Sequence, residues 1–167
     1  MRSDRLEVEE IHEATARLWE AMFEASLEYL EEECECTDSR FLTGSIQING
    51  AWDGAIVLRA SFNFARSIAQ LMLGLDDAGD EEICDAMGEL TNLTSGAIQT
   101  LLPEPSELTP PSVIEGCDYK LVFPGLELIN SIHCRFREEP LSILIFEARS
   151  GDAKIQHEVV VDGVAPR

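Results

Sequence analysis

The stretch around residues 85–96 of this 167-residue chain places acidic and amide side chains at helical spacing. Glu89 lies three residues before Asn92, and Asp85 lies four residues before Glu89. Residues three or four apart share one face of a helix, so these side chains form a row. A carboxylate can pair with a cation, and a neutral carboxamide can both donate a hydrogen bond to water and accept one from it. The row therefore presents a carboxylate and a carboxamide, one helical turn apart, toward solvent or a partner.

A helix over residues 80–102 would position this row. Apolar residues recur at intervals of three and four along it and predict one buried stripe: Ile83, Met87, Leu90, Thr94, Ala97 and Leu101. The opposite face then carries Gly96 and Gln99 together with Asp85, Glu89 and Asn92. Pro103 and Pro105 end the helix.

The middle of this helix is built from weak helix formers. Gly88, Thr91, Asn92, Ser95 and Gly96 each give up from a few tenths to about 1 kcal/mol relative to alanine. Small residues such as Ser95 and Gly96 beside Asn92 would let another surface come close, which favours a functional face. The alternative interpretation is that Gly88 and Gly96 allow tight packing within the fold and that Asn92 is merely exposed.

Elsewhere the pattern predicts both helices and strands. Residues 5–33 read as one long amphipathic helix with an acidic end that should fray, and residues 41–61 as a β-hairpin that reverses near Gly50 and Gly54. The next helix should begin at Ser61 or Asn63, bury Phe64, Ile68, Leu71 and Met72, and end at Gly74.

The second half of the chain predicts a strand-rich end. Extended runs cover residues 113–123, 126–137 and 141–148, with a turn at 138–140 and a final strand near 159–161. Alternate residues of a strand point to the same face of the sheet. In the middle run, these even-numbered residues should therefore face the core together: Leu126, Leu128, Ile132, Cys134 and Phe136.

The net charge limits the possible partners. The chain has 12 Lys and Arg against 32 Asp and Glu, a formal charge of −20. Such a surface repels nucleic acid and anionic membrane, so protein or small-molecule partners are expected. No apolar run approaches the roughly 20 residues of a membrane span, and the charged N-terminus is unlike a signal peptide, so we expect a cytoplasmic protein.

The five cysteines are odd in number and scattered, which predicts reduced, mostly buried thiols. A metal site built from Cys34 and Cys36 with His12, His133 or His157 is the alternative, but the spacing lacks the close pairs of a zinc site. We therefore expect this chain to bind no metal or cofactor of its own.

The segment with Asp85, Glu89 and Asn92, followed by a loop with Pro110 and Pro111, resembles the signature of the CheC/CheX/FliY chemotaxis phosphatases. The order of helices, hairpin and strands over about residues 5–150 is similar to the CheX branch. The resemblance implies an α+β fold, with a mostly antiparallel sheet and long helices packed on it. It also implies a single domain over residues 1–167, in which 151–167 form a last strand or a tail.

The resemblance implies a protein-aspartyl phosphatase whose substrate is a phosphorylated CheY-like response regulator. Asn92 would enter the regulator's active site and orient the attacking water, and Glu89 would pair with the regulator's lysine. Asp85, Ser95, Gly96 and Gln99 would contact the partner, and neither Pro110 nor Pro111 is given a role. The regulator would supply Mg²⁺. The single copy of the motif implies a homodimer.

Two other functions stay open at this point. The same fold could serve as a non-catalytic module that docks on a response regulator or a flagellar-switch protein. The chain could also be an unrelated structural or small-ligand domain.

Overall fold

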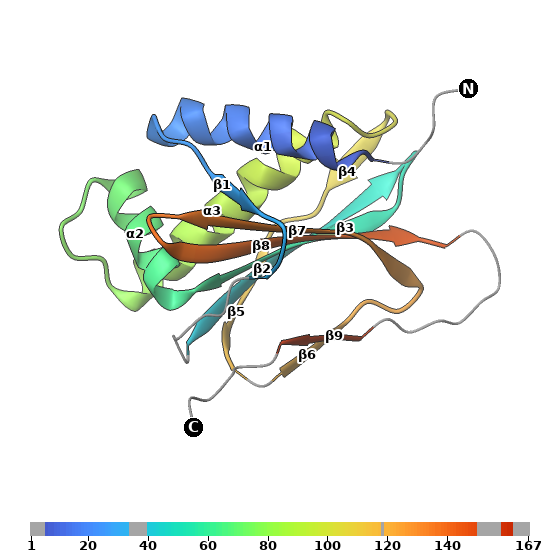
Figure 1. The fold of residues 1–167 in the computed structure, drawn as a ribbon. Helices are drawn as coiled ribbons and strands as arrows, with labels where there is room; N and C mark the ends of the chain where they lie inside the picture. The colour runs from blue at the N-terminus through green and yellow to red at the C-terminus, as the bar shows by residue number, and fades with distance from the viewer. Residues whose placement is uncertain (1–5, 34–39, 118, 150–157, 162–167) are drawn as a thin grey trace.

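The computed structural model describes residues 6–33, 40–117, 119–149 and 158–161. Within them, an antiparallel sheet carries helices on one face and a small two-stranded sheet on the other (Figure 1). The predicted α+β class is therefore confirmed. The helices are α1 (Val8–Phe23), α2 (Phe62–Leu73) and α3 (Asp80–Gln99). None of these three combines the length and apolar character that a bilayer span requires.

The main sheet has the strand order β1-β7-β8-β3-β2-β4, and β5 also pairs with β2. Its strands are β1 (Glu28–Leu30), β2 (Phe41–Gly50), β3 (Gly54–Ser61), β4 (Ser106–Leu108), β5 (Ser112–Gly116), β7 (Leu126–Phe136) and β8 (Glu139–Ala148). The small sheet pairs β6 (Tyr119–Val122) with β9 (Glu158–Val161). The predicted final strand exists, whereas the predicted run over 113–123 is divided between two sheets.

The predicted hairpin over residues 41–61 is confirmed by the pairing of β2 with β3. Phe41 pairs with Ser61 at one end and Ile48 with Gly54 at the other. Gly50 adopts a φ of 142°, which favours glycine, and its N–H donates to Asp53 Oδ1 at 3.0 Å. Ser61 then caps α2 by accepting from the Phe64 N–H at 3.0 Å, and Gly74 ends α2 with a φ of 65°.

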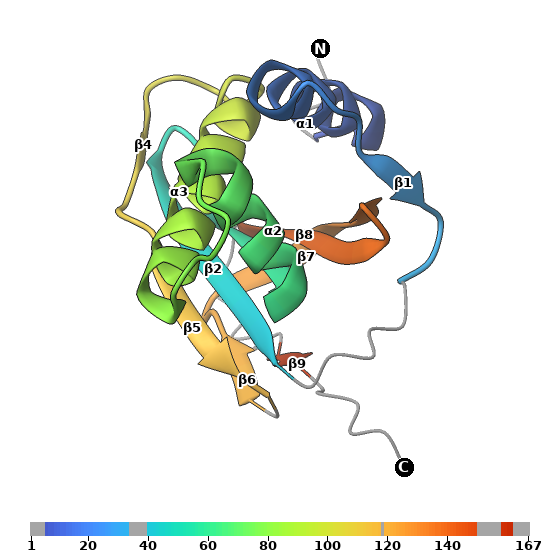
Figure 2. The same cartoon turned by 90° about the vertical axis from the view of Figure 1, so that its left-hand side faces the viewer.

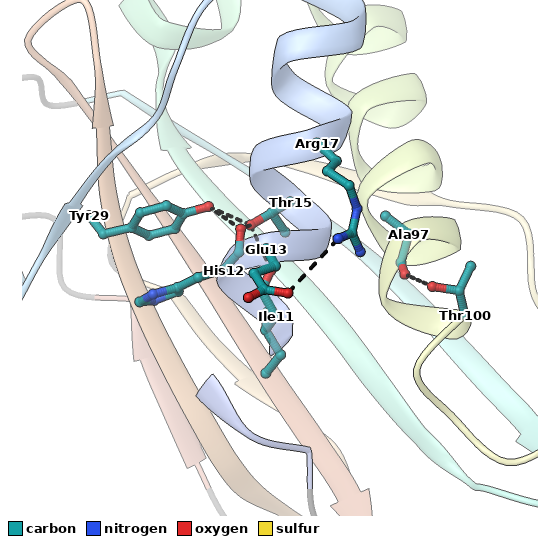
Figure 3. Close-up of polar contacts among 8 residues, drawn as sticks. All are labelled: Ile11, His12, Glu13, Thr15, Arg17, Tyr29, Ala97 and Thr100. Carbon is teal, nitrogen blue, oxygen red and sulfur yellow. Dashed lines mark hydrogen bonds and ion pairs between the residues drawn. The ribbon is translucent and has the colours of Figure 1, made fainter. Parts of the chain in front are cut away.

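Helix α1 is shorter than the predicted helix over residues 5–33. It ends at Glu24, whose φ of 49° is left-handed, and Tyr29 lies in strand β1 on the edge of the sheet. Tyr29 Oη donates to His12 O at 2.9 Å and lies 2.6 Å from Thr15 Oγ1, so β1 is fixed against α1 (Figure 3). A helix that continued to residue 33 would place its acidic residues at the negative end of the helix dipole, which is unfavourable. Residues 28–30 instead pair with β7, and this pairing satisfies their backbone hydrogen-bonding groups.

A β-bulge in β7 corrects the prediction that five residues of one parity face one core. The register shifts between Leu128 and Asn130. After the bulge, Ile132, Cys134 and Phe136 lie in the core beneath the helices, as expected. Before it, Leu126 packs on the opposite face of the sheet and Leu128 is exposed, because an extra residue reverses which parity faces the helices.

Two further details differ from the prediction. The turn between β7 and β8 lies at Arg137 and Glu138, both with positive φ, rather than at 138–140. Neither residue is the glycine or asparagine that normally marks such a turn, so the sequence gives no signal for it. Leu71 of α2 is exposed rather than buried, because the core-facing side of α2 is filled by Phe64, Ala65 and Ile68.

Candidate functional site

Helix α3 starts at the predicted residue. The carboxylate of Glu82 accepts a hydrogen bond from the Gly79 N–H at 2.6 Å, which satisfies one free donor at the helix start. Asp80, Glu81 and Glu82 in the first turn also suit the positive end of the helix dipole. The helix ends at Gln99, after which Leu101 and Leu102 donate to carbonyls three residues back. The predicted helix over residues 80–102 therefore consists of α3 followed by one tighter turn of the 3₁₀ type before Pro103.

The inner face of α3 fixes its position on the sheet. Ile83, Met87, Leu90 and Thr94 are buried as predicted. Ile98 is also fully buried, whereas Ala97 and Leu101 are only half-buried. Alternating spacings of three and four follow the helical repeat of 3.6 residues only approximately. The predicted stripe therefore does not coincide with the core-facing side along the whole helix, and Ile98 is the buried residue near the C-terminal end.

The closest approach between helix and sheet is at Thr91 and Gly44 of β2. A Cβ atom on Gly44 would overlap the Thr91 hydroxyl and lie 3.0 Å from Thr91 Cβ. The Thr91 hydroxyl donates to Met87 O at 2.7 Å, so it is satisfied within the helix. Sequence reasoning missed this contact, although a glycine in the middle of a predicted strand signals close approach of another backbone.

The outer face presents the predicted row. Asp85 and Glu89 are exposed and Asn92 is half-buried. With the residues that the structure describes, the side chains of these three form no hydrogen bond and no ion pair. Glu89 and Asn92 are separated by about 4.5 Å along the axis, so both can reach one partner. Figure 2 shows α3 between α2 and the segment that carries β4 and β5.

Two glycines lie one turn on either side of Asn92, and their surroundings differ. A Cβ on Gly88 would lie 3.5 Å from Val113 Cγ2 and 3.8 Å from Pro111 Cγ, so strand β5 and the residue before it cover that position. A Cβ on Gly96 would meet nothing within 4 Å. The alternative of tight internal packing therefore fits Gly88 and does not fit Gly96.

Two of the expected partner contacts are placed differently from the prediction. Ser95 is fully buried, because it is rotated by about 60° from Asn92 toward the covered side of α3, so the expected exposure is wrong. Gln99 donates from Nε2 to Ser106 O at 2.7 Å and thereby ties the end of α3 to the start of β4. Its amide donor is thus used within the fold.

The electrostatics of this side are strongly negative. The sequence contains no Lys or Arg between Arg66 and Lys120, a stretch that includes all of α3. Arg40 reaches the start of the helix, 3.6 Å from Asp80, and also contacts Glu115. Burial raises the pKa of the Cys84 thiol, and the nearby carboxylates of Glu115 and Asp80 raise it further. A partner of this face must therefore bring its own cations.

The described residues offer little to a metal ion. They contain no group of three or more His, Cys, Asp or Glu side chains arranged to bind one. His12 stacks on Tyr29, and His133 Nδ1 lies 2.9 Å from Ser142 Oγ. Cys34, Cys36 and His157, which the alternative metal site needs, lie outside the described residues.

The fold is that of the CheC and CheX class of chemotaxis proteins. The family model described as "Chemotaxis phosphatase CheX" matches residues 42–136, and the chain belongs to this family. The matched residues contain β2 apart from its first residue, Phe41, and the whole of β3, α2, α3 and β4 to β7. The row of Asp85, Glu89 and Asn92 therefore lies inside the family domain.

Solved structures agree with the fold. CheX from Vibrio vulnificus is 21% identical, with a TM-score of 0.66 over 88% of this chain and 100% of that chain. CheX from Desulfovibrio desulfuricans is 20% identical, with a TM-score of 0.64 over 83% and 97%. A chain of the CheX-CheY-BeF3-Mg²⁺ complex from Borrelia burgdorferi is 15% identical, with a TM-score of 0.63 over 87% and 100%. Among curated proteins, none matches this chain.

Proposed function

We propose that this chain is a protein-aspartyl phosphatase that dephosphorylates a CheY-like response regulator in chemotaxis signalling. The observation that carries the proposal is the pair Glu89 and Asn92, one turn apart on the outer face of α3 and without a hydrogen bond or ion pair to any described residue. Membership of the CheX phosphatase family supports it. Polar groups left without a partner on a rigid helix are ready to bind another molecule.

The chemistry suits a carboxamide. An aspartyl phosphate is an acyl phosphate with a good leaving group, so its hydrolysis depends mainly on a water held in line with the scissile bond. Asn92 can accept from this water and donate to a phosphoryl oxygen without adding negative charge beside an anionic group. The water attacks phosphorus, the P–O bond to the aspartyl carboxylate breaks, and that carboxylate leaves with the bonding electrons. The two protons of the water stay on the inorganic phosphate that forms or pass to solvent.

Glu89 would fix the helix on the regulator. Its carboxylate is exposed, and the sequence has no lysine or arginine between Arg66 and Lys120, a stretch that includes all of α3. A lysine beside the regulator's phosphorylation site would form a charge-assisted pair with it. Asp85, one turn earlier, would extend this contact along the same face.

The regulator would supply the Mg²⁺ that neutralises the phosphoryl oxygens. In the Borrelia burgdorferi structure, the related CheX is found in a complex with CheY, BeF3 and Mg²⁺. We carry this arrangement to the present chain as part of the proposal. The chain itself would then need no cofactor, and its site would act only in the complex.

We also propose that the protein acts as a homodimer. The sequence carries one copy of the motif, so one chain presents one α3 face. Two chains would present two such faces.

The second candidate is a non-catalytic module that docks on a response regulator or a flagellar-switch protein. The acidic side around α3 favours it, because repulsion would slow repeated encounters with an acidic regulator while leaving a slow docking interaction possible. Turnover separates the two functions, since docking alone requires no water held in line.

The test is incubation of a phosphorylated CheY-like receiver and Mg²⁺ with this protein. The decay of the phosphorylated receiver should be faster with the wild-type protein than without it, and the protein should turn over more than once. Binding of a beryllofluoride-treated receiver without any change in the decay would instead support the docking module. If the protein neither binds the receiver nor accelerates its decay, both candidate functions are rejected.

A further inference from the structure

Gly96 is a glycine that the fold of this chain does not require. It lies within α3, where its backbone is helical and no positive φ calls for glycine. A side chain there would project into open space, because nothing lies within 4 Å of its Cβ position. Glycine inside a helix is less favourable than alanine, since it loses more conformational freedom on folding. The isolated protein would therefore be more stable with alanine at this position.

The other glycine of the row shows the contrast. Gly88 lies as far from Asn92 as Gly96 does, but Pro111 and Val113 fill the space beside it. The helix backbone is thus covered by the protein's own chain at Gly88 and left open at Gly96. A surface that closes over Asn92 can reach the helix backbone only at the open position.

We propose that Gly96 is a positioning residue that sets how deeply Asn92 enters the regulator's active site. This inference rests on the proposed phosphatase function and names the point of closest approach of the partner. Side chains four apart on a helix are about 5–6 Å from each other, so a surface that encloses the Asn92 amide also covers Gly96. With no Cβ at position 96, the partner can contact the helix backbone itself.

The depth matters because Asn92 is short. A methyl group at position 96 would insert one C–C bond, about 1.5 Å, between the helix backbone and the partner. Asn92 cannot extend by that amount, and hydrogen bonds operate only over about 2.7–3.2 Å. A misplacement near 1 Å can reduce a rate by about 100-fold. Glutamine is longer than asparagine by one such bond and would recover the lost reach.

The experiment uses the full chain with Gly96→Ala, Gly96→Leu, Gly88→Ala, Asn92→Gln and the double variant Gly96→Ala with Asn92→Gln. Three quantities are measured: the decay rate of the phosphorylated receiver at saturating protein, the affinity for a beryllofluoride-treated receiver, and Tm. Gly88→Ala is the matched control, because it makes the same change in the same helix at a covered position.

Gly96→Ala should raise Tm by about 2–4 °C and yet reduce the saturated rate by about 10- to 100-fold. Gly96→Leu should also weaken binding by at least 10-fold. Gly88→Ala should keep the rate within about twofold. The double variant should be several-fold faster than Gly96→Ala alone, although Asn92→Gln by itself is slower than wild type. A purely structural role for Gly96 would not produce this rescue.

Three results would overturn the inference. They are a wild-type rate for Gly96→Ala, a lower Tm for Gly96→Ala than for wild type, and a double variant that is no faster than Gly96→Ala alone. Each of these is distinguishable from failure of the proposed function, in which the wild-type protein itself does not accelerate the decay. If the wild type binds the receiver without turnover, Gly96→Leu still tests whether the receiver contacts the helix at Gly96. An unchanged affinity in that variant would show that it does not.

Discussion

Thr91 of α3 stands directly over Gly44 of β2, so close that a Cβ on Gly44 would overlap the Thr91 hydroxyl. Thr91 precedes Asn92 in the sequence and lies on the buried side of the helix. The contact therefore fixes the height of α3 above the sheet at the level of the proposed site. It connects the core of the fold to the position of the Asn92 amide.

Gly44→Ala should destabilise the protein by about 1–3 kcal/mol, because the added methyl group overpacks the contact with Thr91. Urea unfolding of the variant and the wild type measures the difference. The phosphatase rate should also fall, since α3 must shift to relieve the overlap. Gly96→Ala is the control for the unfolding measurement alone, because it adds the same methyl group in open space. Equal stability of Gly44→Ala and wild type would contradict the account of this contact.

Asn92→Ala should leave folding and regulator affinity nearly intact and remove most of the acceleration, by about 100-fold or more. The amide makes no hydrogen bond to the described residues, so the fold loses nothing when it is removed. Stopped-flow decay of the phosphorylated receiver measures the effect. Asn92→Asp should be at least as inactive, because a carboxylate repels the phosphoryl group. An unchanged decay with Asn92→Ala would discredit the catalytic assignment.

Glu89→Gln should weaken the complex by about 5- to 10-fold and reduce its dependence on salt, because a charge-assisted pair with the regulator's lysine is lost. Titration of a beryllofluoride-treated receiver at two ionic strengths measures both effects. Glu20→Gln on the exposed side of α1 is a matched control and should bind like wild type. The same affinity for Glu89→Gln and wild type would rule out the pairing.

Stability should fall as the pH rises above 9. Burial raises the pKa of Cys134 from 9.0 to about 12, so the folded state keeps a proton that the unfolded state loses. The contribution is complete below pH 9 and is lost through pH 12, at no more than about 1.4 kcal/mol per pH unit. Urea unfolding at pH 8 and pH 10.5 measures it. Cys134→Ala should show a smaller decrease, due to Cys84, Tyr29 and Tyr119, whose pKa values are also raised by burial. An equal decrease in wild type and variant would contradict the assignment.

Light scattering at micromolar concentration should give about twice the monomer mass of 18.5 kDa if the chain forms the proposed homodimer. The measurement should include the Gly96→Leu variant, whose substitution lies on the face of α3 that we propose meets the regulator. Loss of the dimer in that variant would show that α3 joins two copies instead of meeting a regulator. A monomer mass for the wild type would reject the dimer.

Much of the fold could be predicted because local signals and long-range packing agree. The β2–β3 hairpin, the Ser61 and Gly74 ends of α2, and the start of α3 all follow from residues next to one another. The outward row on α3 also follows from spacing alone, since the helical repeat fixes which side chains share a face.

Other features required the tertiary structure because they depend on contacts between distant residues. The bulge after Leu128 changes which face of β7 each residue occupies, and Tyr29 joins the sheet instead of extending α1. Pairing with a neighbouring strand decides both, and no local pattern encodes it.

The amino-acid sequence by itself determined the chemistry of the site: which side chains lie on α3, their spacing, and the absence of lysine and arginine from residues 67–119. Only the tertiary structure decided which of those positions are accessible. Ser95 is buried, Gly88 is covered by Pro111, and Gly96 is open. The reason is physical, because a helical repeat orders residues around an axis, whereas accessibility depends on what the rest of the chain packs against each side.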